Sequence, residues 1–104
     1  MMIARWSIDA RFGHKPVVVS MLQSWTKNIG SQIGWSADKV RLLTGSIGAH
    51  ESTVQSEIVI RDLAELNTAW EKLATIEAHL QWSKEMEPHV VSGSPRWEIF
   101  RLLD

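Results

Sequence analysis

The 104-residue chain contains no cysteine and no tyrosine. Without cysteine it can form no disulfide, no thiolate nucleophile and no thiolate-ligated metal site. This composition is typical of proteins in a reducing cytoplasm. No stretch approaches the roughly 20 apolar residues of a membrane helix, and the first residues lack the apolar centre of a signal peptide. We therefore predict a cytoplasmic protein with no membrane partner.

The chain also lacks a strong charge and the common ligand-binding motifs. Its formal net charge is −1, and its lysines and arginines are scattered, so no basic patch would attract nucleic acid. No histidine pair has metal-ligand spacing such as His-x-x-x-His, and the glycines of residues 45–48 are not followed by the Lys-Ser/Thr of a phosphate loop. We predict no nucleic-acid partner, no metal and no cofactor.

Tryptophan is unusually abundant, with six residues beside two phenylalanines. Each indole carries a large apolar area and one N–H group that needs an acceptor when it is buried. Two interpretations follow: the tryptophans fill the core of a small protein, or some of them line a pocket for a flat ligand.

Hydrophobic periodicity predicts four strands and two helices. Residues 3–12 alternate as a strand does, with one apolar face made of Ala4, Trp6, Ile8, Ala10 and Phe12. Apolar residues at helical spacing then predict a helix that starts near Pro16 and ends near Gly30, followed by a loop from which Ile33 and Trp35 pack onto the core. The other predicted strands are residues 40–44, 54–61 and 96–103, the first two joined by a hairpin turn.

The second predicted helix follows directly from the third strand. Asp62 and Glu65 have the spacing of a capping box, which favours a helix start at this point, and Pro88 ends the pattern. The main apolar stripe consists of Leu63, Leu66, Trp70, Leu73, Ile76 and Leu80. A second stripe, rotated from the first, consists of His79, Trp82 and Met86. Either the helix bends or restarts near residues 75–77, or its far end presents a separate apolar face.

The order β-α-β-β-α-β predicts a single α+β domain over residues 1–104, with two helices on one face of a four-stranded antiparallel sheet, as in ferredoxin-like proteins. The other face of the sheet also carries apolar residues, because Leu43, Val59, Phe100 and Leu102 point away from the helices. Such a surface is a liability for a monomer in water. We expect a second copy to cover it, sheet against sheet.

In topology, length and strand-into-helix junction at residues 61–66, the chain resembles the dimeric α/β-barrel superfamily. This group includes the antibiotic-biosynthesis monooxygenase-like, stress-responsive barrel and NIPSNAP families. The resemblance implies a homodimer with a pocket in each subunit between sheet and helices. Members include cofactor-independent oxygenases and isomerases, and the fold alone does not select among these activities.

Charged residues form one group that could carry a function. Arg5, Ser7, Asp9 and Arg11 share the face of the first strand that points away from the helices, and Glu57 and Arg61 point the same way. We favour ion pairs that order the dimer, because charges at such an interface must be paired. The alternative is a site for an anionic ligand, since arginine suits bidentate contact with a carboxylate or phenolate.

The pocket between sheet and helices is the second candidate. Its predicted ligand-binding residues are Trp6, Trp25, Asn67, Trp70 and Trp82. His79 is the candidate catalytic residue, because the resemblance implies it: in haem-degrading members of the superfamily a histidine late in the second helix ligates iron, and His79 matches that place. The tryptophan that accompanies it on the third strand is absent here, and the alternative is a histidine that only forms a hydrogen bond at a helix or dimer surface. We therefore predict a homodimeric protein that binds a small, aromatic or anionic molecule. The alternatives are a cofactor-independent monooxygenase or isomerase, and a self-association module without a ligand.

Overall fold

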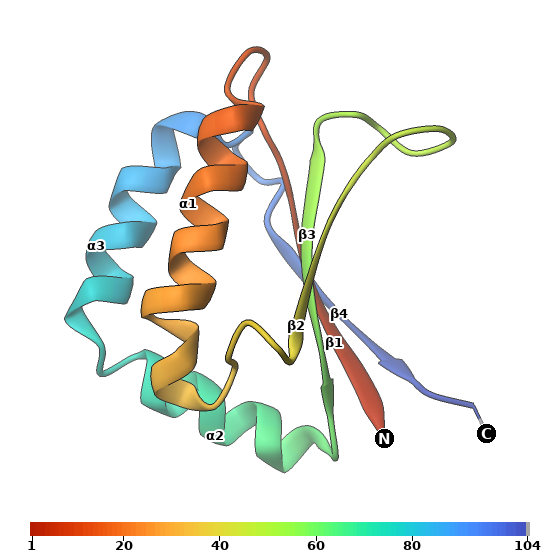
Figure 1. Cartoon of the computed structure of the whole chain (residues 1–104), viewed down its shortest axis with the longest axis vertical. Helices are drawn as coiled ribbons and strands as arrows, with labels where there is room; N and C mark the ends of the chain where they lie inside the picture. Colours follow the sequence, from red (N-terminus) through yellow and green to blue (C-terminus); the bar gives the residue numbers. More distant parts are fainter. Residues whose placement is uncertain (104) are drawn as a thin grey trace.

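The sheet is the central element of the computed structural model, which describes residues 1–103 (Figure 1). Asp104, the last residue of the predicted domain, lies outside the described residues. The elements run β1 (Met2–Asp9), α1 (Lys15–Asn28), η1 (Gly30–Ile33), β2 (Val40–Thr44), β3 (Thr53–Ile60), α2 (Leu63–Leu73), α3 (Glu77–Met86), η2 (Glu87–His89) and β4 (Arg96–Arg101). The four strands are antiparallel, in the order β2-β3-β1-β4. This is the predicted ferredoxin-like α+β fold.

The helices all lie on one side of this sheet, as predicted, but residues 1–103 form three α-helices instead of two (Figure 1). The second predicted helix is interrupted after Leu73, where Ile76 takes an extended conformation with φ −91° and ψ 108°. Of the two alternatives predicted for the second stripe, the restart of the helix near residues 75–77 is correct. After the break Trp82 and Met86 pack on the core, whereas Leu80, predicted in the main stripe, is 50% exposed.

The start of α2 confirms the predicted cap. The Asp62 carboxylate accepts a 2.9 Å hydrogen bond from the N–H of Glu65, which satisfies one of the free donors of the first turn. Glu65 in return accepts from the N–H of Arg61, one residue before the cap. The reversal from β3 into α2 is thus fixed by residues 61–65.

The first strand is shorter than predicted. Its regular pairing ends at Asp9, and Ala10 forms an isolated bridge to Val90. The N–H of His14 then donates to the carbonyl of Arg11, closing a turn that contains Gly13 at φ 82°. The prediction that Phe12 belongs to the inner face is therefore wrong: its side chain is fully exposed in this turn.

Two hydrophobic clusters fill the space between sheet and helices. One contains Trp25, Trp35 and Ile33, so the prediction that the loop after α1 packs back on the core is confirmed. The other contains Ile8 and Leu22, together with residues of α3 and the segment after it. Within residues 1–103, no helix has the length and apolar character needed to cross a membrane.

Gly30 allows the chain to turn tightly after α1. A Cβ atom at this position would lie 2.6 Å from the carbonyl oxygen of Trp35 and 3.0 Å from the indole of Trp25. We expect Gly30→Ala to lower the free energy of unfolding by about 1–3 kcal/mol, the usual cost of overpacking. Urea denaturation measures this loss, with Gly93→Ala as a comparison because a Cβ there meets no neighbouring atom, although its φ of 80° adds backbone strain. A stability of Gly30→Ala equal to wild type would contradict the close approach.

The open face of the sheet, away from the helices, carries side chains in cross-strand rows. One row is apolar: Val59, Ile3 and Phe100 are paired across β3, β1 and β4. The neighbouring row is charged, with the order Arg41, Glu57, Arg5 and Glu98. Val59 is 48% exposed and Phe100 is 42% exposed, so the apolar row is only partly covered.

Glu57 is the buried centre of the charged row, with 4% of its surface exposed. One carboxylate oxygen accepts from Nε and Nη2 of Arg5 at 3.0 and 2.8 Å, and the other accepts from Nη2 of Arg41 at 2.5 Å. The Arg5 guanidinium also lies 4.9 Å from the centroid of the Phe100 ring. The arginines are thus engaged with a carboxylate of the chain itself, which favours the ion-pair interpretation over a site for an anionic ligand.

Candidate functional site

A cavity of about 260 Å³ lies between the sheet and the helices. All six tryptophans of the chain line it, together with the side chain of His79. The tryptophans come from six different segments, and no two of them share an element: Trp6 on β1, Trp25 on α1, Trp35 after η1, Trp70 on α2, Trp82 on α3 and Trp97 on β4. The tryptophans are therefore gathered in one place. Both interpretations of their abundance are partly correct, because they contribute to the core and also line a pocket.

The structure brings four of the predicted ligand-binding tryptophans together here, Trp6, Trp25, Trp70 and Trp82. Sequence reasoning missed Trp35 and Trp97 as pocket residues. Trp97 is the direct cross-strand partner of Trp6 and so shares its face of the sheet. No local pattern signalled this placement, because both faces of the last strand are partly apolar.

Asn67, also predicted to bind a ligand, does not line the cavity. Its side chain is exposed on α2, where Nδ2 donates a 3.0 Å hydrogen bond to a carboxylate oxygen of Glu71. Each residue of an α-helix turns the side chain by about 100°, and Asn67 therefore points away from the direction taken by the buried Leu66. The structure supplies no role for Asn67 at this site.

The aromatic rings of the wall form two groups. In one, Trp97 lies between Trp70 and Trp35, with ring centroids 5.4 and 6.1 Å apart. In the other, Trp82 contacts Trp6, Trp25 and His79, with centroids 6.1–6.2 Å apart. The contacts are tilted or edge-on, except that His79 stacks on Trp82, and aromatic contacts at these distances are favourable. The rings thus pack against one another in the wall of the cavity.

His79 is held by a tryptophan. Its Nδ1 accepts a 3.0 Å hydrogen bond from Nε1 of Trp25, and its ring stacks on Trp82 with an interplanar angle of 18°. Burial lowers the pKa of His79 below its ordinary value of 6.5, since the surroundings disfavour the charged ring. A neutral imidazole that accepts at Nδ1 carries its hydrogen on Nε2. His79 is thus a fixed, neutral ring with one remaining N–H donor.

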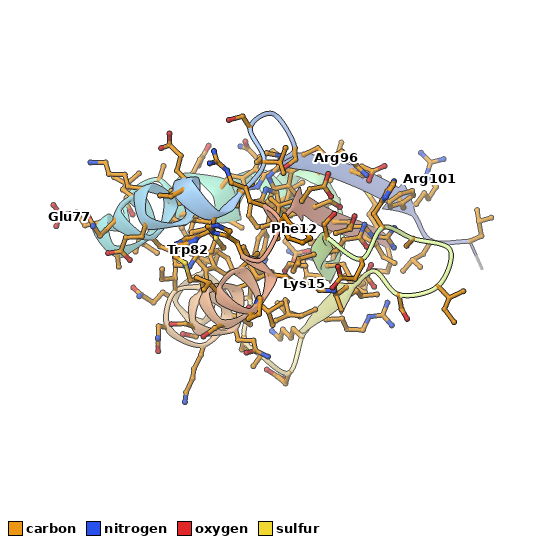
Figure 2. All side chains as sticks on the ribbon, turned by 90° about the horizontal axis from the view of Figure 1, so that it is seen from above. Phe12, Lys15, Glu77, Trp82, Arg96 and Arg101 are labelled. Atoms are coloured by element: carbon orange, nitrogen blue, oxygen red, sulfur yellow. The ribbon has the colours of Figure 1, made fainter. Side chains whose placement is uncertain are left out.

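The second fixed indole is that of Trp82, whose Nε1 donates a 2.9 Å hydrogen bond to the carbonyl of Met21 on α1. Figure 2 shows Trp82 between α3 and α1, where it ties the two helices together. Besides His79, the polar side chains of the wall are the hydroxyls of Ser56 and Ser83, and none of the lining residues is charged. The cavity therefore suits a mainly apolar, uncharged molecule with one or two hydrogen-bonding groups.

Metal ligands do not gather at this cavity. Within residues 1–103, no group of three or more histidine, aspartate or glutamate side chains is placed to hold a metal ion. The chemistry that the site offers comes from its aromatic surface, its two hydroxyls and the imidazole of His79.

Comparison with known proteins places the fold. No protein-family model matches the chain, and no curated protein matches its sequence. Among solved structures, the chain is similar to an uncharacterised NIPSNAP domain protein from Burkholderia xenovorans (TM-score 0.74, 14% identity, covering 99% of this chain and 95% of that one). It is also similar to a NIPSNAP family protein from Agrobacterium tumefaciens (0.79, 17%, 100% and 95%) and to an antibiotic biosynthesis monooxygenase (0.64, 8%, 100% and 100%).

These likenesses define a class by its fold: a ferredoxin-like α+β protein of the kind found in NIPSNAP and antibiotic biosynthesis monooxygenase-like proteins. The resemblance predicted from the sequence is confirmed at that level. At identities of 8–17% the shared feature is the architecture, and function must be argued from the site.

Proposed function

We propose that the chain is a cytoplasmic, homodimeric α/β-barrel protein that binds a small, flat aromatic molecule in the tryptophan-lined cavity. The observation that carries this proposal is the convergence of all six tryptophans and His79 on one cavity of about 260 Å³. A core built only for stability would bury its aromatic side chains, because exposed apolar area forgoes hydrophobic stabilisation, yet Trp70 and Trp97 in this wall are 37% and 38% exposed. An open aromatic cavity is better explained by a ligand.

The chemical class of the ligand follows from the wall. Indole faces favour a flat ring, and the absence of charged lining residues favours a neutral one. The Nε2–H of neutral His79 and the serine hydroxyls can bind one oxygen atom, as in a phenol or a ring ketone. A neutral ring bearing a single oxygen therefore fits better than a carboxylate.

The homodimer is proposed from the open face of the sheet. The apolar row of Val59, Ile3 and Phe100 lies beside a charged row whose buried carboxylate is neutralised within the chain. A second copy would cover the apolar row.

Binding of 1-naphthol, followed by isothermal titration calorimetry, tests the proposed ligand class. We expect one site per chain with a dissociation constant of about 10–100 μM, as befits a ligand of about eleven heavy atoms. Ser56→Leu should weaken binding about tenfold or more, because the larger side chain fills part of the cavity. Thr68→Leu on the exposed side of α2 is the matched control and should bind as wild type does. Absence of saturable binding to the wild type would overturn the proposal.

An enzyme of the cofactor-independent oxygenase or isomerase type is the second candidate, and one observation favours it. Such an enzyme needs a polar group in the pocket with a perturbed pKa, and burial gives His79 that property. Disappearance of 1-naphthol under air, without added cofactor and at a rate lowered by His79→Gln, would support catalysis. An unchanged 1-naphthol concentration would show that the protein binds this molecule without converting it. A module that only self-associates is the least supported, because it has no need of the cavity.

A further inference from the structure

A second cavity of about 400 Å³ adjoins the first. Its wall is formed by Ile8 on β1, by Met86 at the end of α3, and by the loop from Val90 to Pro95 that leads into β4. Both cavities are lined by Trp6 and Trp82, and Ser83 contributes to both. A compact ring would occupy only the first cavity, so the binding of such a ring does not account for the second cavity beside it.

Two tryptophan rings separate the cavities. The centroids of Trp6 and Trp82 lie 6.2 Å apart, and the rings are tilted by 52°. Trp82 is fixed by its hydrogen bond to the carbonyl of Met21 and by stacking on His79. Trp6 projects from β1, the strand that is paired on both of its sides, so its backbone is equally fixed. The partition therefore consists of two indoles, a hydrogen-bonded one from Trp82 and one from Trp6 on a backbone that is paired on both sides.

We propose that Trp6 determines ligand length: it restricts the first cavity to compact ring systems and excludes rings that carry an alkyl chain. This inference rests on the proposed function, because it concerns the ligand of the same cavity. The lining of the second cavity is largely apolar, with Ile8, Met86, Val90 and Val91 among its residues and Glu87 as its one charged member. Once the Trp6 indole is removed, an alkyl chain attached to a bound ring would pass into this apolar space.

Calorimetric titration of two probes tests the partition: 1-naphthol as a compact ring and 4-hexylphenol as a ring with a chain. We expect the wild type to prefer 1-naphthol. Trp6→Ala should bind 4-hexylphenol at least about tenfold more tightly than the wild type does, because the chain gains an apolar surface to contact. Its affinity for 1-naphthol should fall, since one wall of the first cavity is lost.

The matched control is Trp97→Ala. Trp97 pairs with Trp6 across β1 and β4 and lines the first cavity, but it does not line the second. Its loss should weaken 1-naphthol binding without a gain for 4-hexylphenol. Circular dichroism verifies that each variant is folded. If Trp6→Ala does not fold, Trp6→Leu shortens the partition with less loss of packing. Trp6→Leu should also bind 4-hexylphenol more tightly than the wild type does, by a smaller factor.

The outcomes separate the two proposals. Wild-type binding of 1-naphthol combined with an unchanged affinity of Trp6→Ala for 4-hexylphenol would overturn the partition and retain the proposed function. An equal gain in Trp97→Ala would also overturn it. If the wild type binds no 1-naphthol and Trp6→Ala gains 4-hexylphenol, the partition is supported and the proposed ligand class is rejected. If neither protein binds either probe, both proposals are wrong.

Discussion

Val59→Glu is expected to convert the proposed homodimer into a monomer at micromolar concentration. Val59 lies at the β3 end of the apolar row on the open face of the sheet, where it is 48% exposed. In a single chain the new carboxylate would remain in water, so folding should be little affected. In a sheet-to-sheet dimer it would be buried without a partner, at a cost of several kcal/mol, and two-fold symmetry would apply this cost twice.

Size-exclusion chromatography with light scattering measures the change. We expect the wild type at twice the 11.8 kDa mass of the chain and Val59→Glu at the mass of one chain. Leu80→Glu is the matched control: Leu80 is 50% exposed, but it lies on α3, on the opposite side of the molecule (Figure 1). This variant should remain dimeric. A monomeric wild type, or a dimeric Val59→Glu, would show that the open face is not the interface.

Acidification is expected to weaken both ligand binding and stability through His79. The native pKa of this residue lies below its ordinary value of 6.5, so the unfolded chain takes up the proton first as the pH falls. The full stability is therefore present above about pH 6.5, and it decreases as the pH falls from 6.5 through the native pKa. Protonation of Nδ1 also removes the acceptor for the Trp25 indole, which loosens the cavity wall.

We expect the affinity for 1-naphthol to fall by about threefold to tenfold between about pH 7.5 and pH 5, measured by calorimetry. His79→Gln provides the control, because its side-chain oxygen can still accept from Trp25 and the amide does not titrate. This variant should bind with a much smaller pH dependence. An equal pH dependence in wild type and His79→Gln would assign the effect to another group.

The sheet was largely predictable because apolar and polar residues alternate regularly in β1 and β3. In β3, Val54, Ser56, Ile58 and Ile60 face the helices, as the two-residue period indicated, and Asp62 marks the start of α2 correctly. The prediction failed at the end of β1. The regular pairing stops at Asp9, and the turn closed by the N–H of His14 and the carbonyl of Arg11 takes Phe12 out of the strand, although the alternation of apolar residues continues to that position.

The site was also predicted in part from the periodicity of apolar residues. This periodicity places Trp6 on the inner face of its strand and Trp25 on the inner face of its helix, whatever residues lie opposite them. Trp97 needed the register between β1 and β4, because both faces of the last strand are partly apolar in sequence. The hydrogen bond from Trp25 to His79 joins residues 54 positions apart and depends on the restart of the helix at Glu77. Tertiary geometry of this kind has no local signature.

The restart of the helix at Glu77 affects how the site can change during evolution. Trp70 stands on α2, which crosses one end of the sheet, whereas His79 and Trp82 stand on α3, which runs alongside α1 (Figure 1). The three residues from Ala74 to Ile76 alone connect these two walls. Substitution, insertion or deletion there can alter the angle between the walls without disturbing any strand. The breadth of the cavity is thus adjustable at the exposed residues Ala74 and Thr75, whereas Ile76 packs against the core.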